Sequence, residues 1–308
     1  MPLTEYISTL ADQNGGTAKW DINTKTAEVV VNGKTMHYKL DRGKVWEYNS
    51  DTGIGKIAGT IKNDKIDVTD EYFHKTFFAE KELRDELGAL IKKDLNFVEE
   101  NKNVGFYSTN EAIDIVLKYD GEITKVCNEL GVPKAMTQAI LFKEIRMKDA
   151  RDVLADSFVM EYYRYNHEVE RFFDLPLWQQ ILVGAPKLNS PMREDSSTGL
   201  GQIFAKTAIN AYNAAIQRED IIGQEIDYND WHQREKVWDA LRTDDKENIF
   251  YAALVLKNEA VNLNIDLSKA SNNQIQNTLA RYNGTNTAAA EYGKETLQYY
   301  ILFDSYNK

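Results

Sequence analysis

The apolar pattern of the chain changes near residue 78, and this change limits the fold classes that the sequence can adopt. From Ala18 to Thr69 the pattern is typical of β-strands, whereas from Phe78 onward it is helical almost without interruption. Strands followed by helices predict an α+β protein. The chain has 308 residues, which is more than one average domain. We expect a small N-terminal β-rich module at residues 1–77, a helical connector at 78–106 and a mainly α-helical domain at 107–308.

The strongest strand signal lies around Asn32-Gly33. Strand-like runs at Ala27–Val31 and Lys34–Leu40 flank this dipeptide. Asn-Gly favours the two positive φ angles of a type I′ turn, so the three segments together predict a β-hairpin. Further strands are expected at Lys44–Tyr48 and between residues 56 and 69, with a break near residue 63.

Charge and composition exclude several classes of ligand. The formal net charge is -11 and the pI is near 5.0, which argues against binding to nucleic acid or to an anionic membrane surface. Cys127 is the single cysteine, so no intramolecular disulfide can form. Residues 1–30 contain no long apolar run, and we expect neither a signal peptide nor a membrane span. The chain then either lacks its leader or leaves the cell by another route.

The helix expected after Pro133 carries a carboxylate on its apolar side. Met136, Ile140 and Glu144 are spaced four apart, so Glu144 continues the apolar stripe and lies away from Lys143 and Arg146. Burial raises the pKa of a carboxyl group toward the range in which it can hold and deliver a proton. The pattern favours either a general acid or a buried Glu satisfied by an Arg or a Tyr.

A glycine-rich loop precedes the helix expected at Ala205–Arg218. Its sequence is Ser-Ser-Thr-Gly-Leu-Gly-Gln-Ile, residues 196–203. The two glycines allow positive φ angles and a close approach of the backbone to a ligand, and Gln202 offers both a donor and an acceptor. Such a loop suits a groove for a ligand rich in hydroxyl and amide groups.

Four motifs in order give the chain a family resemblance. They are Glu144 in a helix, Gly199-Leu200-Gly201-Gln202, Asn248-Ile249, and Tyr282-Asn283-Gly284. This order resembles that of the soluble lytic transglycosylases and goose-type lysozymes of the lysozyme-like superfamily, over roughly residues 107 to 304. Two positions differ from the family pattern: Ile145 stands where Ser is usual, and Gly201 where Met is frequent.

The resemblance implies a lysozyme-like catalytic domain that cleaves peptidoglycan glycan strands. Glu144 would be the single general acid and base, the hydroxyl of Tyr282 would point at it, and Asn283 would shape the turn. The sugar would be held by the loop, namely Ser197, Gly199, Leu200, Gly201, Gln202 and Ile203. A transglycosylase of this kind consumes no water, because the C6 hydroxyl of the muramic sugar attacks its own C1 and gives a 1,6-anhydro product.

Two other functions stay open at this stage. A goose-type muramidase would hydrolyse the same bond, with Glu194 or Asp195 positioning water; the alternative is that these two acids only form a polar loop. A non-catalytic cell-wall-binding or assembly protein could also keep this fold. Cleavage of the bond between N-acetylmuramic acid and N-acetylglucosamine is the leading interpretation.

Residues 148–193 are expected to be an insertion relative to the shortest family members. Its aromatic residues either form a wall of the glycan groove or pack a lid helix onto itself. They are Tyr162, Tyr163, Tyr165, Phe172, Phe173 and Trp178.

No cofactor or metal is expected. His37, His74, His167 and His232 are scattered in the sequence, without the spacing of a zinc motif.

The expected partner is the glycan strand. The N-terminal module either binds cell wall, anchors the protein to an assembly such as a phage tail or secretion apparatus, or covers the catalytic domain. The expected location is extracellular, periplasmic or cell-wall-associated.

Overall fold

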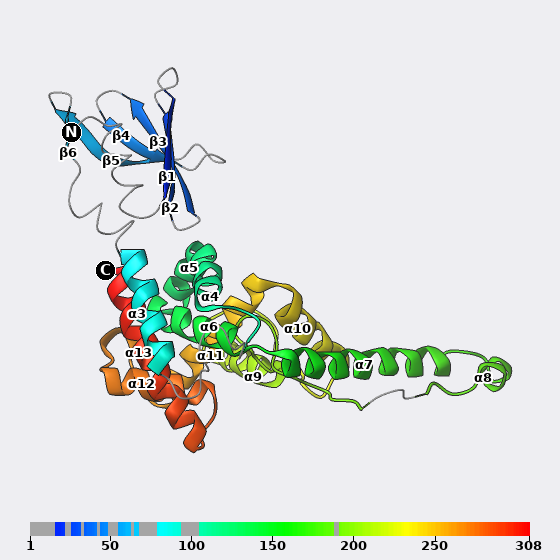
Figure 1. The fold of residues 1–308 in the computed structure, drawn as a ribbon. Coiled ribbons are helices and arrows are strands. Elements are labelled where there is room, and N and C mark those ends of the chain that lie inside the picture. Colours follow the sequence, from blue (N-terminus) through cyan, green and yellow to red (C-terminus); the bar gives the residue numbers. More distant parts are fainter. Residues whose placement is uncertain are drawn as a thin grey trace. The chain divides into compact units, whose positions relative to one another are not determined.

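A computed structural model describes residues 16–21, 26–31, 34–41, 44–48, 55–62, 65–67, 79–93, 105–187 and 191–308 of the protein. The chain divides into two compact units, residues 1–82 and residues 83–308. The first contains the strands and the second contains almost all of the helical residues, so the predicted α+β class is confirmed. Figure 1 shows both units along the chain.

The first unit is an antiparallel β-meander. Its strands are hydrogen-bonded in sequence order, β1-β2-β3-β4-β5-β6. In the predicted hairpin, Val31 pairs with Lys34, and the buried side chains of Ala27 and Tyr38 lie opposite each other. The turn residues Asn32 and Gly33 lie outside the described residues. The strands are β1 Thr17–Asp21, β2 Thr26–Val31, β3 Lys34–Asp41, β4 Lys44–Tyr48, β5 Gly55–Lys62 and β6 Lys65–Asp67.

The second unit is a helical assembly around one core. Helix α3 begins in the first unit and continues into the second, where Leu83, Leu87 and Ile91 are buried in that core. The helices are α3 Ala79–Lys93, α4 Thr109–Lys118, α5 Asp120–Leu130, α6 Lys134–Met147, α7 Ala150–Phe173, α8 Leu177–Val183, α9 Ala205–Gln217, α10 Trp231–Thr243, α11 Asp245–Asn262, α12 Asn272–Tyr282 and α13 Thr287–Asn307, with a 3-10 turn at Leu267–Lys269.

Glycine and proline set the boundary between α5 and α6. Gly131 has a φ of 67°, a left-handed conformation in which its backbone N–H donates to the carbonyl of Cys127 and ends α5. Pro133 immediately precedes α6, where its missing N–H costs no helical hydrogen bond. The helix expected after Pro133 is therefore confirmed.

Helix α6 is buried over most of its surface, which differs from the expected pattern of one apolar face. It contacts α4, α5, α11, α12 and α13. Lys143 and Arg146 are as buried as their apolar neighbours. The ammonium of Lys143 pairs with Glu295, and Arg146 donates to the carbonyl of Tyr107. Both cations have partners from other elements, so their positions do not mark a solvent-facing side of the helix.

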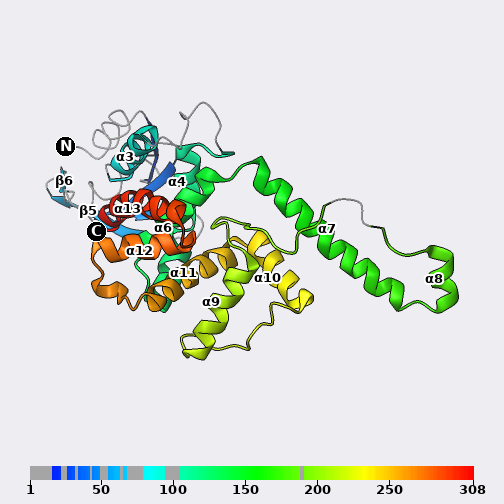
Figure 2. The same ribbon diagram turned by 90° about the horizontal axis from the view of Figure 1, so that it is seen from below.

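Helix α7 begins beside the core and carries α8 at its far end. Figures 1 and 2 show α7 leading away from α9, α10 and α11 toward α8. Tyr162 and Tyr163 face α10, where Arg234 donates to both of their hydroxyl groups. Phe173 and Trp178 are exposed beyond this contact. None of the aromatic residues expected to form either a glycan wall or a self-packed lid helix lines the groove described below.

Within the described ranges, every helix is too short or too polar to cross a bilayer.

Candidate active site

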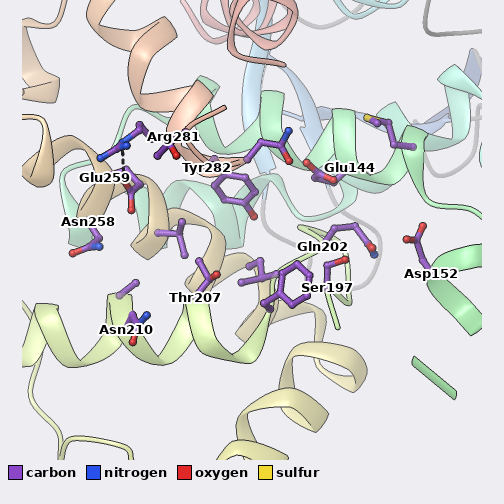
Figure 3. Close-up of a pocket in the computed structure, with 18 of the residues that line it drawn as sticks. Glu144, Asp152, Ser197, Gln202, Thr207, Asn210, Asn258, Glu259, Arg281 and Tyr282 are labelled. Carbon is purple, nitrogen blue, oxygen red and sulfur yellow. Dashed lines mark ion pairs between the residues drawn. The ribbon is translucent and has the colours of Figure 1, made fainter. Parts of the chain in front are cut away.

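A polar groove of about 640 Å³ runs between α6, α7, α9, α11, α12 and the glycine-rich loop. Figure 3 shows Glu144 and Tyr282 on one side of it and Ser197 and Gln202 facing them. Asp152 from α7 lies at one end. Thr207, Asn210, Asn258, Glu259 and Arg281 lie toward the other end. Motifs spread over about 140 residues of sequence therefore meet at one cavity.

Glu144 is a carboxyl group of this groove whose pKa is strongly raised by its surroundings. Its side chain is partly exposed, because it faces the cavity, yet burial by the surrounding helices raises the pKa of Glu144 to about 7. The hydrogen bond from Tyr292 and the charge of Lys143 oppose this increase, and the charge of Asp152 adds to it. A carboxyl group with this pKa holds a proton near neutral pH and can also release it.

Tyr292, rather than Tyr282, donates the hydrogen bond to Glu144. The Tyr292 hydroxyl lies 2.6 Å from Oε1 of Glu144, whereas the Tyr282 hydroxyl donates to the carbonyl of Gly201 at 2.7 Å. The expected hydroxyl contact between Tyr282 and Glu144 is therefore wrong. Tyr282 still lines the groove and ties α12 to the glycine-rich loop. Burial, followed by the nearby Glu144, holds the pKa of both tyrosines well above the usual value, so both stay protonated donors.

A glycine in the middle of α13 explains how Tyr292 reaches Glu144. A Cβ at Gly293 would lie 2.6 Å from the Cβ of Ala280 and 2.7 Å from the carbonyl oxygen of Gln276, both on α12. Only glycine lets the two helices approach so closely, which offsets its low helix propensity. The dipeptide Tyr292-Gly293 is the signal in the sequence that points to this contact.

The glycine-rich loop is a tight reversal closed by two backbone hydrogen bonds. Thr198 and Ile203 exchange N–H···O bonds of 3.2 and 3.1 Å, leaving residues 199–202 as the turn. Gly199 and Gln202 have positive φ angles of 75° and 48°. Nε2 of Gln202 donates to the carbonyl of Gly199 at 2.8 Å, which stabilises this strained turn from within. The Gln202 side chain lines the groove.

Asn248 anchors the glycine-rich loop to α11 through side-chain hydrogen bonds. This fully buried residue of α11 accepts a hydrogen bond from the N–H of Gly201 at 2.7 Å. Its Nδ2 donates to the carbonyls of Thr198 and Leu241 at 3.1 and 2.9 Å. A Cβ at Gly199 would lie 2.0 Å from this Nδ2, so glycine is required there. Asn248-Ile249, the third motif of the resemblance, thus supports the second.

The two acids proposed as a second carboxylate do not line the groove. The carboxylate of Asp195 accepts the backbone N–H groups of Ala205 and Lys206 at 2.9 Å each and so caps α9. Glu194 has an exposed side chain, 3.6 Å from Arg234. These positions favour the other interpretation, in which the two acids only form part of a polar loop. The carboxylates that do line the groove, besides Glu144, are Asp152 and Glu259.

Asp156 of α7 supports the outer side of the loop. Its carboxylate accepts hydrogen bonds from Ser196 at 2.7 Å and from Thr198 at 2.9 Å. The indole N–H of Trp238 also donates to the Ser196 hydroxyl, at 3.2 Å. Ser196 and Thr198 are therefore structural residues, whereas the neighbouring Ser197 lines the groove.

The structure brings together most, but not all, of the predicted site. Glu144, Ser197, Gln202, Ile203, Tyr282 and Asn283 line the groove; Gly199, Leu200 and Gly201 shape its loop without lining it. Phe204, which is 42% exposed, Asp152 and Asn210 also line the groove and were not predicted from the sequence. His167 and His232 are far apart in the sequence, but the structure brings them together where α7 meets α10.

Comparison of the chain with protein-family models, with curated proteins and with solved structures finds no match.

Proposed function

We propose that the protein cleaves the glycan strands of peptidoglycan between N-acetylmuramic acid and N-acetylglucosamine, as a lytic transglycosylase with a lysozyme-like helical domain. The observation that carries this proposal is Glu144, a carboxyl group with a pKa of about 7 in an open polar groove. The Gly-Leu-Gly-Gln loop opposite this carboxyl group, with its support from Asn248, adds the second element of the family pattern.

The chemistry of the groove suits a neutral polymer rich in hydroxyl and amide groups. Thr207, Asn210 and Asn258 present such groups along one part of the groove. Phe204 adds an exposed aromatic face, on which the apolar face of a sugar can stack. Lys148, Arg151 and Arg281 carry three positive charges and Asp152 and Glu259 carry two negative ones. The lining is therefore neutral when Glu144 is ionised and has one excess positive charge when Glu144 is protonated.

In the proposed reaction, one carboxyl group serves both proton transfers. Protonated Glu144 donates to the bridging oxygen, the bond from that oxygen to C1 of the muramic sugar breaks, and the N-acetylglucosamine end leaves as an alcohol. The Glu144 carboxylate then accepts the proton of the C6 hydroxyl as its oxygen bonds to C1. The 1,6-anhydro ring closes, no water is consumed and Glu144 is protonated again.

Purified peptidoglycan sacculi provide the test. The protein should release soluble glycan fragments from sacculi, whereas heat-denatured protein should release none. Cosedimentation with sacculi without release of fragments would reject the enzyme and favour the non-catalytic cell-wall-binding protein. No release and no binding would reject both.

A hydrolytic muramidase is the second candidate, and it now depends on Asp152. This residue lines the groove, and its charge raises the pKa of Glu144. Its carboxylate also accepts the backbone N–H of Asp149 at 2.8 Å in the capping box of α7. For a transglycosylase, Asp152→Asn should lower the rate by less than about tenfold and leave the products unchanged; loss of about 100-fold or more would favour hydrolysis with Asp152 as the base.

The proposed reaction predicts a pH profile. Glu144 must begin protonated, and its pKa is near 7. The second-order rate constant on soluble glycan strands should therefore fall as pH rises through about 7, because the acid form is lost above the pKa. Tyr292→Phe removes a hydrogen bond that lowers this pKa. The variant should move the falling limb to higher pH by about one pH unit.

Tyr282→Phe is the matched control for this profile. It removes a hydroxyl from the same groove, but that hydroxyl donates to Gly201 instead of Glu144. The variant should lower the rate, because the glycine-rich loop loses its hydrogen bond from Tyr282. The falling limb should stay within a few tenths of a pH unit of its wild-type position. If both variants moved the limb equally, Tyr292 would not have the special role assigned to it here.

The location and the partners follow from the substrate. We place the protein at the cell wall, outside the cytoplasm, either in the periplasm or on the cell surface. The β-rich unit would join the enzyme to a larger assembly such as a phage tail or a secretion apparatus. No nucleic acid or membrane partner is part of this proposal.

A further inference from the structure

Side chains of helices α7 and α10 meet along a seam whose outer end carries two His-x-x-Glu pairs. His167 and Glu170 lie one turn apart on α7, and His232 and Glu235 lie one turn apart on α10. Nearer the groove, the same seam contains the hydrogen bonds of Arg234 to Tyr162 and Tyr163. The four outer residues face one another across the seam, because His167 contacts Glu235 and His232 contacts Glu170.

We propose that this cluster binds a divalent transition-metal ion, Zn²⁺ in the first place. One ring nitrogen from each of His167 and His232 and one carboxylate oxygen of Glu235 lie within 4.8 Å of one another. Ligand atoms around tetrahedral zinc lie about 2.0 to 2.2 Å from the metal, and so about 3.4 Å from one another. Small side-chain rotations bring the three atoms to that spacing, since their helices are already joined.

Glu170 completes the cluster as the partner of one imidazole. Its Oε1 lies 2.8 Å from Nε2 of His232. A carboxylate that accepts the proton of Nε2 leaves Nδ1 of a neutral ring with a free lone pair, which is the arrangement found around many metal-bound histidines. On His167 the Nε2 contact with Glu235 at 2.8 Å is the one that the metal would replace. Two neutral imidazoles and two carboxylates also balance a charge of +2.

An indole ring covers one side of the cluster. Trp231 stacks on His232 with ring centroids 3.7 Å apart and meets His167 edge-on at 4.7 Å. This ring limits rotation of both imidazoles and keeps water from that side. The side chains of His232 and Glu170 are 52% and 47% exposed, so a metal ion can enter from the other side. The ion would clamp α7 to α10 where α7 leads toward α8.

Metal titration of the full-length protein without a polyhistidine tag tests this site. After chelator treatment and dialysis, one Zn²⁺ per chain should bind with a dissociation constant of about 1 µM or tighter, measured by calorimetry. Co²⁺ should give the visible absorption bands of a tetrahedral site. His167→Gln and His232→Gln should each weaken binding by at least about 100-fold, and Glu170→Gln by about tenfold.

His37→Gln is the control, because His37 lies on β3 in the other unit. Its Zn²⁺ affinity should equal that of wild type. Zn²⁺ at 100 times the dissociation constant should raise the thermal midpoint of wild type by about 5 °C and leave the midpoint of the His167→Gln/His232→Gln double variant unchanged. The absence of Zn²⁺ binding to wild type would overturn the proposal. It would also be overturned if the double variant still bound Zn²⁺ while its melting curve in chelator matched that of wild type. The Glu144 assignment does not depend on either outcome.

Discussion

Glu144→Gln is expected to lower the rate of glycan release by at least about 1000-fold while the protein remains folded. The substitution removes the only group assigned to both proton transfers, and general acid–base catalysis alone accounts for about 100- to 10,000-fold in rate. Gln is nearly isosteric with Glu and can still accept the hydrogen bond from Tyr292. The rate should be measured on soluble glycan strands, with circular dichroism to verify folding.

The same variant should also change how stability depends on pH. The pKa of Glu144 is raised in the folded protein, so ionisation of this group opposes folding above pH 4.5 and increasingly up to about pH 7. Wild type should therefore lose stability relative to Glu144→Gln between these values, by up to about 3 kcal/mol. At pH 4 the two proteins should have nearly equal free energies of unfolding.

Glu129→Gln is the matched control, because it makes the same chemical change at an exposed residue of α5 outside the groove. It should leave both the rate and the pH dependence of stability unchanged. A Glu144→Gln protein that retained a tenth or more of the wild-type rate would refute the assignment of Glu144 as the acid.

Asn248→Ala is expected to have the largest effect on stability of the substitutions considered. It leaves the buried N–H of Gly201 and the carbonyl of Leu241 without this partner, and it leaves the carbonyl of Thr198 with the N–H of Ile203 alone. Each unpaired buried polar group costs about 1 to 3 kcal/mol, so the free energy of unfolding should fall by about 3 to 5 kcal/mol. Urea denaturation measures this loss. The activity of the remaining folded protein should also fall, because the loop loses its support.

Asn258→Ala provides the comparison on the same helix. Asn258 lies on α11 at the groove, and its Oδ1 accepts one hydrogen bond, from Arg218 at 3.0 Å. The stability of this variant should fall by about 1 kcal/mol or less. Equal losses for the two variants would mean that Asn248 is an ordinary α11 residue without a special role in holding the loop.

Local pattern was sufficient to predict the elements of this fold. Alternation and turn residues located the strands, and the structure confirms the helix expected after Pro133 and the turn expected at Asn283-Gly284. The order of motifs also predicted that Glu144 and the glycine-rich loop would share a site, and both border one groove. These features depend on neighbouring residues or on a family pattern.

Contacts between distant residues could not be predicted in the same way. Tyr292 and Glu144 are 148 residues apart, and their contact depends on the close packing of α12 and α13 at Gly293. Periodicity assigned Lys143 to a polar face, but α6 is enclosed by other helices and Lys143 pairs with Glu295. The acids before the loop looked available in the sequence; Asp195 instead caps α9.

The histidines illustrate the same limit. A search for zinc motifs looks for ligands close together in sequence, whereas His167 and Glu235 are 68 residues apart and meet only because side chains of α7 and α10 contact each other in the fold. Each helix contributes one His-x-x-Glu pair, and neither pair alone resembles a zinc motif. The contact between the two helices, and not the spacing in the sequence, brings the four residues together.

The most direct test of the central claim is the chemistry of the new glycan ends. Sacculi would be digested in water enriched in the heavy oxygen isotope, with wild type and with Glu144→Gln, and the soluble fragments examined by mass spectrometry. We predict fragments that are lighter than the hydrolytic products by one water, that carry no heavy oxygen and that are absent with Glu144→Gln. Reducing ends that carry the heavy isotope, or fragments that form equally without Glu144, would contradict the account.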